Sequence, residues 1–159
     1  MTTMAASSTH EVGVALPLMV CLVMTLATIV IQATAMIWIL SFVRHHHRLG
    51  RTGVWFWLDV TILSGAIVLA GTAHLLDVLI WAVVFVLCGQ IGQLSVAFYS
   101  SAMLYTSLGT GDVAMSSSWK LLGPFETADG MLAFGVSTAI TIFVAQLMLR
   151  KKFPDLPDL

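Results

Sequence analysis

The chain has 159 residues, of which 58% are hydrophobic and 9% are charged; its formal net charge is -1 and its mean hydropathy is +0.97. Soluble domains carry roughly 25% charged residues, so this composition excludes a soluble globular protein and indicates an integral membrane protein. A neutral net charge without an extended basic run excludes electrostatic binding to nucleic acid. Cys21 and Cys88 both lie in apolar stretches, so we expect neither a disulfide framework nor a metal site.

The first apolar run covers residues 12–43 and exceeds the roughly 20 residues that a membrane-spanning helix needs. Residues 1–11 contain no Lys or Arg, so the basic region of a signal peptide is missing there. The run ends at the densest basic cluster of the chain, residues 44–51. We therefore expect residues 1–52 to form an extra N-terminal transmembrane helix followed by a basic cytoplasmic loop.

The histidine triplet in that cluster has two interpretations. His45, His46 and His47 could sense pH, because imidazole titrates near pH 6.5, or they could bind a metal ion. A weakly basic interfacial loop is the more frequent explanation of such a triplet.

The second apolar run covers residues 54–90 and contains only three ionisable residues, Asp59, His74 and Asp77. A single helix of this length would reach about 55 Å, against a hydrocarbon core of about 30 Å. Two helices would turn near residues 71–74, which is the four-span alternative. The positive-inside rule favours one long helix, because the basic clusters at 44–51 and 150–152 must then be separated by an even number of crossings. It also predicts an external N-terminus and a cytoplasmic C-terminus.

Two pairs of ionisable residues are spaced i, i+3, so each pair shares one helix face. His74 and Asp77 form an intramembrane pair that could support a gate or a subunit contact, or that could mark a turn at the membrane surface. Glu126 and Asp129 could face a cavity and concentrate cations, or they could face neighbouring helices and bond to His74 or to hydroxyl groups of residues 94–106. No catalytic triad, phosphate loop or metal-ligand spacing occurs, so we expect no enzyme.

Residues 98–112 have the composition expected of a cation-binding segment. They read Phe-Tyr-Ser-Ser-Ala-Met-Leu-Tyr-Thr-Ser-Leu-Gly-Thr-Gly-Asp. Gly109 and Gly111 can adopt positive φ at little cost, and alternation with Leu108 and Thr110 lets successive carbonyls face one side. Four such segments around an axis would form rings of oxygens that replace the hydration shell of a cation. The alternative is a Gly/Ser-rich extracellular loop.

The same segment resembles the pore module of the tetrameric potassium-channel superfamily. The family pattern Thr-(Val/Ile/Leu)-Gly-(Tyr/Phe)-Gly-Asp corresponds to Ser107-Leu108-Gly109-Thr110-Gly111-Asp112. Trp119 follows Asp112 by seven residues, as a tryptophan does at the start of the inner helix in simple family members, and Gly130 and Gly135 stand about midway along that helix. The resemblance covers roughly residues 74–149 and leaves out the first helix.

The resemblance implies an all-α membrane protein in which four copies surround a pore and hold K⁺ or another monovalent cation, with no further cofactor. Each copy would carry the extra N-terminal helix, a pore domain (53–152) and a short tail (153–159). The pore domain would contain an outer helix (53–90), a re-entrant pore helix (94–106), a filter (107–112) and an inner helix (119–149). The filter would present Ser107, Leu108, Gly109, Thr110 and Gly111, and its supporting residues would be Asp112, Tyr99, Thr106 and Met103. Gly130 and Gly135 would be possible hinges.

Three departures from the family pattern bear on selectivity. Thr110 replaces the aromatic residue that braces the filter, Ser107 replaces threonine, and Met103 stands where some members carry a glutamate. The first departure implies a less rigid filter and relaxed selection of K⁺ over Na⁺. The expected function is a passive cation channel in the plasma or inner membrane; the alternative is a non-conducting scaffold or sensor with the same fold.

Overall fold

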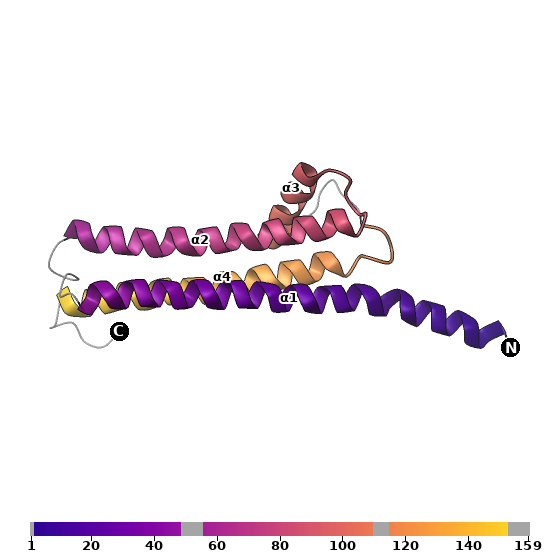
Figure 1. Cartoon of the computed structure of the whole chain (residues 1–159), viewed down its shortest axis with the longest axis horizontal. Helices are drawn as coiled ribbons and strands as arrows, with labels where there is room; N and C mark the ends of the chain where they lie inside the picture. Colours follow the sequence, from indigo (N-terminus) through magenta and orange to yellow (C-terminus); the bar gives the residue numbers. More distant parts are fainter. Residues whose placement is uncertain (1, 49–55, 110–114, 153–159) are drawn as a thin grey trace. The chain divides into compact units, whose positions relative to one another are not determined.

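The computed structural model describes residues 2–48, 56–109 and 115–152, and this part of the chain is helical without a strand (Figure 1). The helices are α1 (Thr2–Arg48), α2 (Phe56–Leu87), α3 (Leu94–Tyr105) and α4 (Leu122–Lys152). Three stretches are long and apolar enough to cross a membrane: Ala15–His46, Phe56–Leu87 and Leu122–Arg150. The prediction of an all-α membrane protein with three long apolar helices is confirmed.

Helix α2 is continuous through residues 71–74, where the four-span alternative placed a turn. The backbone leaves the helix after Leu87, and Gly89 then adopts a φ of 65°, a left-handed conformation that glycine tolerates. The 32 residues of α2 correspond to about 48 Å of helix, which exceeds the hydrocarbon thickness of about 30 Å. Part of α2 must therefore extend beyond the hydrocarbon or tilt within it.

Several predicted boundaries differ from the structure: α2 ends at Leu87 rather than at residue 90, α3 ends one residue early at Tyr105, and α4 continues to Lys152 rather than ending at residue 149. Helix α1 continues to Arg48, so His45 and His46 are helical rather than part of a loop, and Nδ1 of His46 lies 3.0 Å from the Phe42 carbonyl oxygen one turn earlier. Helix α4 begins at Leu122 and not at Trp119, which belongs to the preceding turn. Pro124 then falls in the first turn of α4, where a missing N–H costs little.

The chain forms two compact units, and each long helix contributes to both. Unit 1 contains Met1–Val30 and Leu76–Leu132, and unit 2 contains Ile31–Leu75 and Ala133–Leu159. In unit 2 the three helix segments run antiparallel to their neighbours in the chain (Figure 1), and they bury one apolar cluster. Its members are Ile39, Val43, Ile62, Ala66, Ala70, Ile140, Val144 and Met148.

The basic ends of α1 and α4 lie at the same end of unit 2 (Figure 1). Arg44 and Arg150 are both exposed there. Two crossings, by α2 and α4, separate these residues in the chain. This arrangement agrees with the even number of crossings that the positive-inside rule requires.

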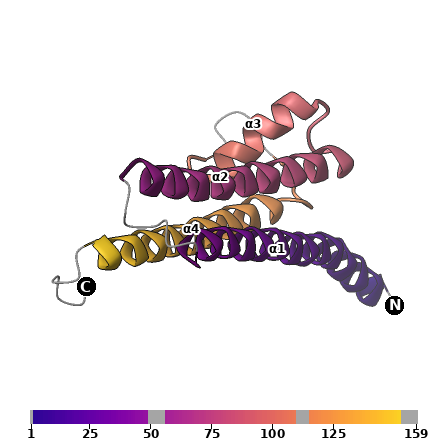
Figure 2. The ribbon, with the colours of Figure 1, turned by 60° about the vertical axis from the view of Figure 1, so that its left-hand side comes forward.

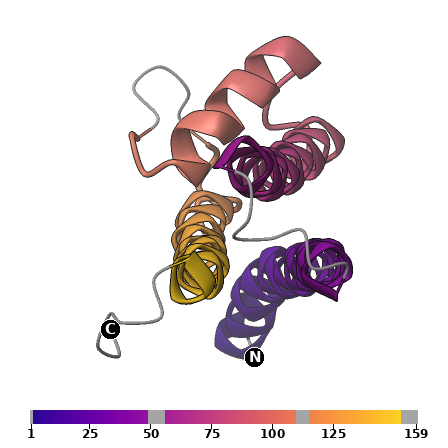
Figure 3. The same cartoon turned by 90° about the vertical axis from the view of Figure 1, so that its left-hand side faces the viewer.

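Helix α3 belongs to unit 1. Figures 2 and 3 show α3 running obliquely beside the second half of α2 and the first half of α4. Ala97 and Leu104 of α3 join an apolar cluster with Trp81, Phe85 and Leu122, all of them buried. The opposite side of α3 is exposed, as is usual for a surface that faces lipid or another subunit.

Candidate functional site

Helix α3 is too short to span a membrane. Its 12 residues correspond to about 18 Å, little more than half of the hydrocarbon thickness. It lies in the chain between α2 and α4, which are both long enough to span. Non-spanning backbone at membrane depth is tolerated where protein buries it or where it lines a water-filled cavity, so the surroundings of α3 and of the residues after it define the candidate site.

The C-terminal end of α3 closes in a Schellman motif. The N–H of Ser107 donates to the Leu104 carbonyl at 2.9 Å, and the N–H of Leu108 donates to the Met103 carbonyl at 2.9 Å. Ser107 has a φ of 61° and occupies the left-handed position at which glycine is usual. Two residues later Gly109 has a φ of 95°, so the sign of φ alternates over residues 107–109.

The left-handed φ of Ser107 disfavours a β-branched residue at this position. A β-branched residue is a strong outlier at positive φ, whereas a small polar residue pays less. We expect Ser107→Thr to lower the free energy of unfolding by about 1 kcal/mol and Ser107→Gly to raise it by a similar amount. Titration of purified protein with denaturing detergent measures both changes, and equal stability of the two variants would contradict this explanation.

A buried carboxyl of α2 holds the last residue of α3. The hydroxyl of Tyr105 donates to Oδ2 of Asp77 at 3.0 Å, and the exposed fractions of the two residues are 1% and 0%. Burying a charged or polar group without a partner is costly, so this bond fixes the C-terminal end of α3 against α2.

Helix α4 contacts the same end of α3 through two polar groups. The hydroxyl of Ser101 is hydrogen-bonded to Oε1 of Glu126, and it also lies 2.8 Å from the Val78 carbonyl oxygen of α2. The hydroxyl of Thr127 donates to the Leu104 carbonyl at 3.0 Å. The Leu104 carbonyl, which also accepts from the Ser107 N–H, thus has a second donor on α4.

Gly130 brings the backbone of α4 directly against the end of α3. A Cβ on this residue would overlap the carbonyl oxygen of Tyr105 and would lie 2.9 Å from its carbonyl carbon. At Gly135 a Cβ would meet nothing within 4 Å. Gly130 is therefore required for the close packing of α4 against α3. The sequence suggested a hinge at this residue and did not indicate this packing role.

The acid Asp129 connects α4 to α1 within unit 1. The Thr28 hydroxyl lies 3.3 Å from Oδ2 of Asp129, and both residues are buried. Glu126 thus bonds to a hydroxyl group of α3, one of the arrangements that the sequence left open, whereas the partner of Asp129 is on α1, which the sequence did not indicate.

His74 belongs to a different polar cluster, in unit 2. Its Nδ1 lies 3.2 Å from the Gln32 side-chain nitrogen and its Nε2 lies 3.0 Å from the Ser137 hydroxyl. The ring also stacks on Phe134 with 4.5 Å between centroids. Asp77, three residues later on α2, accepts the hydroxyl hydrogen bond of Tyr105 in unit 1.

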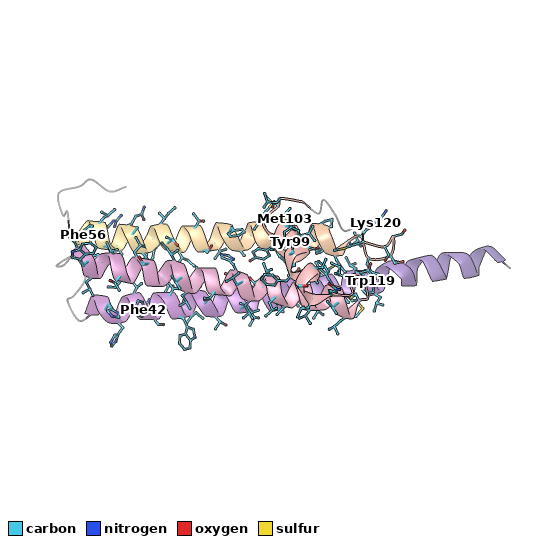
Figure 4. All side chains as sticks on the ribbon, turned by 90° about the horizontal axis from the view of Figure 1, so that it is seen from above. Phe42, Phe56, Tyr99, Met103, Trp119 and Lys120 are labelled. Carbon is cyan, nitrogen blue, oxygen red and sulfur yellow. The ribbon has the colours of Figure 1, made fainter. Side chains whose placement is uncertain are left out.

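The residues that were expected to support the filter differ in their exposure and in their contacts. Tyr99 is 58% exposed and Met103 is half-buried, and Figure 4 labels both on α3. The Thr106 hydroxyl donates to the Ala102 carbonyl at 2.6 Å and so caps its own helix. Thr110, Gly111 and Asp112 lie outside the described residues.

The segment that leads into α4 is attached to the end of α2. Oε1 of Gln90 accepts from the Ser116 N–H at 3.0 Å and from its hydroxyl at 2.8 Å. The Gln90 side-chain nitrogen donates to the Cys88 carbonyl at 2.9 Å. Trp119 packs against the apolar cluster of unit 1 and precedes exposed Lys120 (Figure 4). The two ends of the segment between α2 and α4 are thus joined next to the candidate site.

Several residues of this site escaped the sequence analysis: Thr28, Gln90, Ser101, Tyr105 and Thr127. Each has a partner on another helix or loop, at separations of 23 to 101 residues for the bonds given above. Spacing within one helix carries no information about such partners. A weaker signal for these residues was present in the sequence. Buried acids need hydrogen-bond donors, and Ser101 and Tyr105 are two hydroxyl donors one turn apart on the only short apolar helix among the described residues.

No family model, curated protein or solved structure matches this chain.

Proposed function

We propose that the chain forms a passive cation channel in which four copies surround a pore and residues 107–111 bind the ion. The observation that carries this proposal is the short helix α3 between two spanning helices, ended by a turn whose φ alternates in sign at Ser107 and Gly109. A helix that cannot span must return its chain to the face from which it came. The C-terminal end of its dipole carries a partial negative charge, which favours a cation.

The expected ions are K⁺ and, with relaxed selectivity, Na⁺. Support comes from the resemblance of residues 107–112 to the potassium-channel filter and from the threonine at position 110 in place of an aromatic residue. The pore would lie in the plasma or inner membrane, with the C-terminus in the cytoplasm and the N-terminus outside. Glu126 and Asp129 bond within their own subunit, so backbone carbonyls and hydroxyls would provide the ion ligands.

Flux through liposomes tests this function. The purified protein is reconstituted, and reversal potentials are measured under K⁺, Na⁺ and Rb⁺ gradients. We expect a cation current that reverses near the equilibrium potential of the permeant cation. Absence of current from protein that is folded and tetrameric would favour the non-conducting scaffold or sensor.

Gly109→Ala tests the role of the turn. No atom lies within 4 Å of a Cβ at this residue, so the change acts through its φ of 95° and not through a clash. A side chain in this conformation costs about 1–2 kcal/mol, and we expect an about tenfold loss of flux at unchanged protein amount. Gly92→Ala is the matched control, because Gly92 has open space and no positive φ. Equal flux in both variants would contradict an ion site at Gly109.

A further inference from the structure

Glu126 is the most completely enclosed acid of α4. Its exposed fraction is 0%, and its Oε1 is hydrogen-bonded to the hydroxyl of Ser101, which is also fully buried. The second oxygen, Oε2, has no hydrogen-bond partner among the described residues. An acid buried in this way is costly, so its position calls for a role.

The contact with Ser101 is placed where it controls the orientation of α3. Ser101 is joined at the same time to α4 through Glu126 and to α2 through the Val78 carbonyl. By contrast, the first turn of α3 has no side-chain cap, because Gln93 makes no capping hydrogen bond. The second half of α3 therefore determines how the helix is rotated and how far it reaches along α4.

The turn that follows is rigidly attached to α3. Two backbone hydrogen bonds of 2.9 Å tie Ser107 and Leu108 to the last turn of the helix. A rotation of α3 about its axis must consequently move residues 107–109 as well. Ser101 lies six residues before Ser107, so a change at the Glu126 contact is transmitted over less than two helical turns.

We propose that Glu126 is a positioning residue for ion selection, which sets the place of residues 107–109 by holding α3 through Ser101. This role rests on the proposed channel function. It predicts that the relative permeability of K⁺ and Na⁺ depends on the hydrogen bond between these two side chains and not on the charge of Glu126.

Reversal potentials of four variants in the full chain test this role. Glu126→Gln retains a side chain of the same shape that can donate to or accept from the Ser101 hydroxyl, and it keeps the K⁺/Na⁺ permeability ratio of the wild type. Glu126→Leu and Ser101→Ala each remove the bond and change the ratio about fivefold, the order expected for one buried hydrogen bond. Thr141→Val is the control, because the Thr141 hydroxyl bonds only to the Ser137 carbonyl of its own helix.

The double variant Glu126→Leu/Ser101→Ala gives a further criterion. If the two side chains act through one hydrogen bond, the K⁺/Na⁺ permeability ratio of the double variant equals that of each single variant. Independent effects would instead multiply. Additive effects, a wild-type ratio in Glu126→Leu, or an equal change in Glu126→Gln and Glu126→Leu would each overturn the role. Ser101→Ala is the smallest of these changes, so it still tests the loss of the hydrogen bond if Glu126→Leu fails to fold.

Hydrogen exchange separates this role from the channel function. Amides of Leu94–Tyr105 in protein held in lipid nanodiscs should exchange faster in Glu126→Leu and Ser101→Ala, and at the wild-type rate in Glu126→Gln and Thr141→Val. A wild-type protein without current would refute the channel function. Faster amide exchange of α3 in Glu126→Leu and Ser101→Ala would still show that Glu126 positions α3. Unchanged exchange in Glu126→Leu would refute the positioning role even in a conducting protein.

Discussion

Gly130→Ala is expected to destabilise the protein and to abolish cation flux. A Cβ would overlap the Tyr105 carbonyl oxygen, and the neighbouring carbonyl carbon and Cα would lie at 2.9 and 3.1 Å. These atoms are backbone, so the strain can be relieved only if the end of α3 moves away from α4. Overpacking of this kind costs about 1–3 kcal/mol, and the displaced segment is the one that leads into residues 107–109. Unfolding in denaturing detergent and liposome flux measure the two effects.

Gly135→Ala is the matched control on the same helix. A Cβ at Gly135 has nothing within 4 Å, and alanine favours a helix over glycine by about 1 kcal/mol. We expect unchanged or slightly higher stability and wild-type flux. If Gly135→Ala abolished flux while Gly130→Ala left it intact, a hinge at Gly135 would explain the helix better than close packing at Gly130.

Tyr105→Phe is expected to have the second-largest effect. The change removes the hydroxyl that donates to Oδ2 of the fully buried Asp77. Loss of a donor to a buried carboxyl costs about 1–3 kcal/mol in the free energy of unfolding. Detergent-induced unfolding of the single and double variants with Asp77→Leu gives the coupling energy of the pair, which we expect to be in the same range.

Tyr99→Phe provides the contrast for that experiment. Tyr99 is 58% exposed, and changes at exposed positions usually stay within about 0.5 kcal/mol. Stability losses of the same size at both tyrosines would show that the loss comes from removing any hydroxyl of α3. A coupling energy near zero between Tyr105 and Asp77 would likewise contradict a stabilising hydrogen bond between these two side chains.

The overall helix pattern followed from composition and charge placement. The basic clusters around residues 44–51 and 150–152 favoured an even number of crossings between them, and the structure has one continuous α2. Element ends were less accurate, because the polar histidines after residue 44 are compatible with a helix as well as with a loop. The one signal that α4 begins three residues after Trp119 was Pro124, which is tolerated in the first turn of a helix.

Partners across helices could not be predicted from the sequence. An acid such as Glu126 is compatible with a cavity or with a neighbouring hydroxyl, and the choice depends on how α3 is rotated against α4. Gly130 illustrates the same limit, since a glycine in a helix can provide flexibility or space. The positive φ at Gly109 was expected from its residue type, whereas the one at Ser107 arises from the helix end that precedes it.

The turn after α3 also has a consequence for the sign of the charge that it can accept. The N–H groups of Ser107, Leu108 and Gly109 all point back to carbonyls of α3, at 2.9, 2.9 and 3.3 Å. An anion needs such donors in order to replace its hydration shell, and here they are already engaged. Chloride should therefore gain nothing at this turn, so under the proposed channel function the helix end itself would exclude anions.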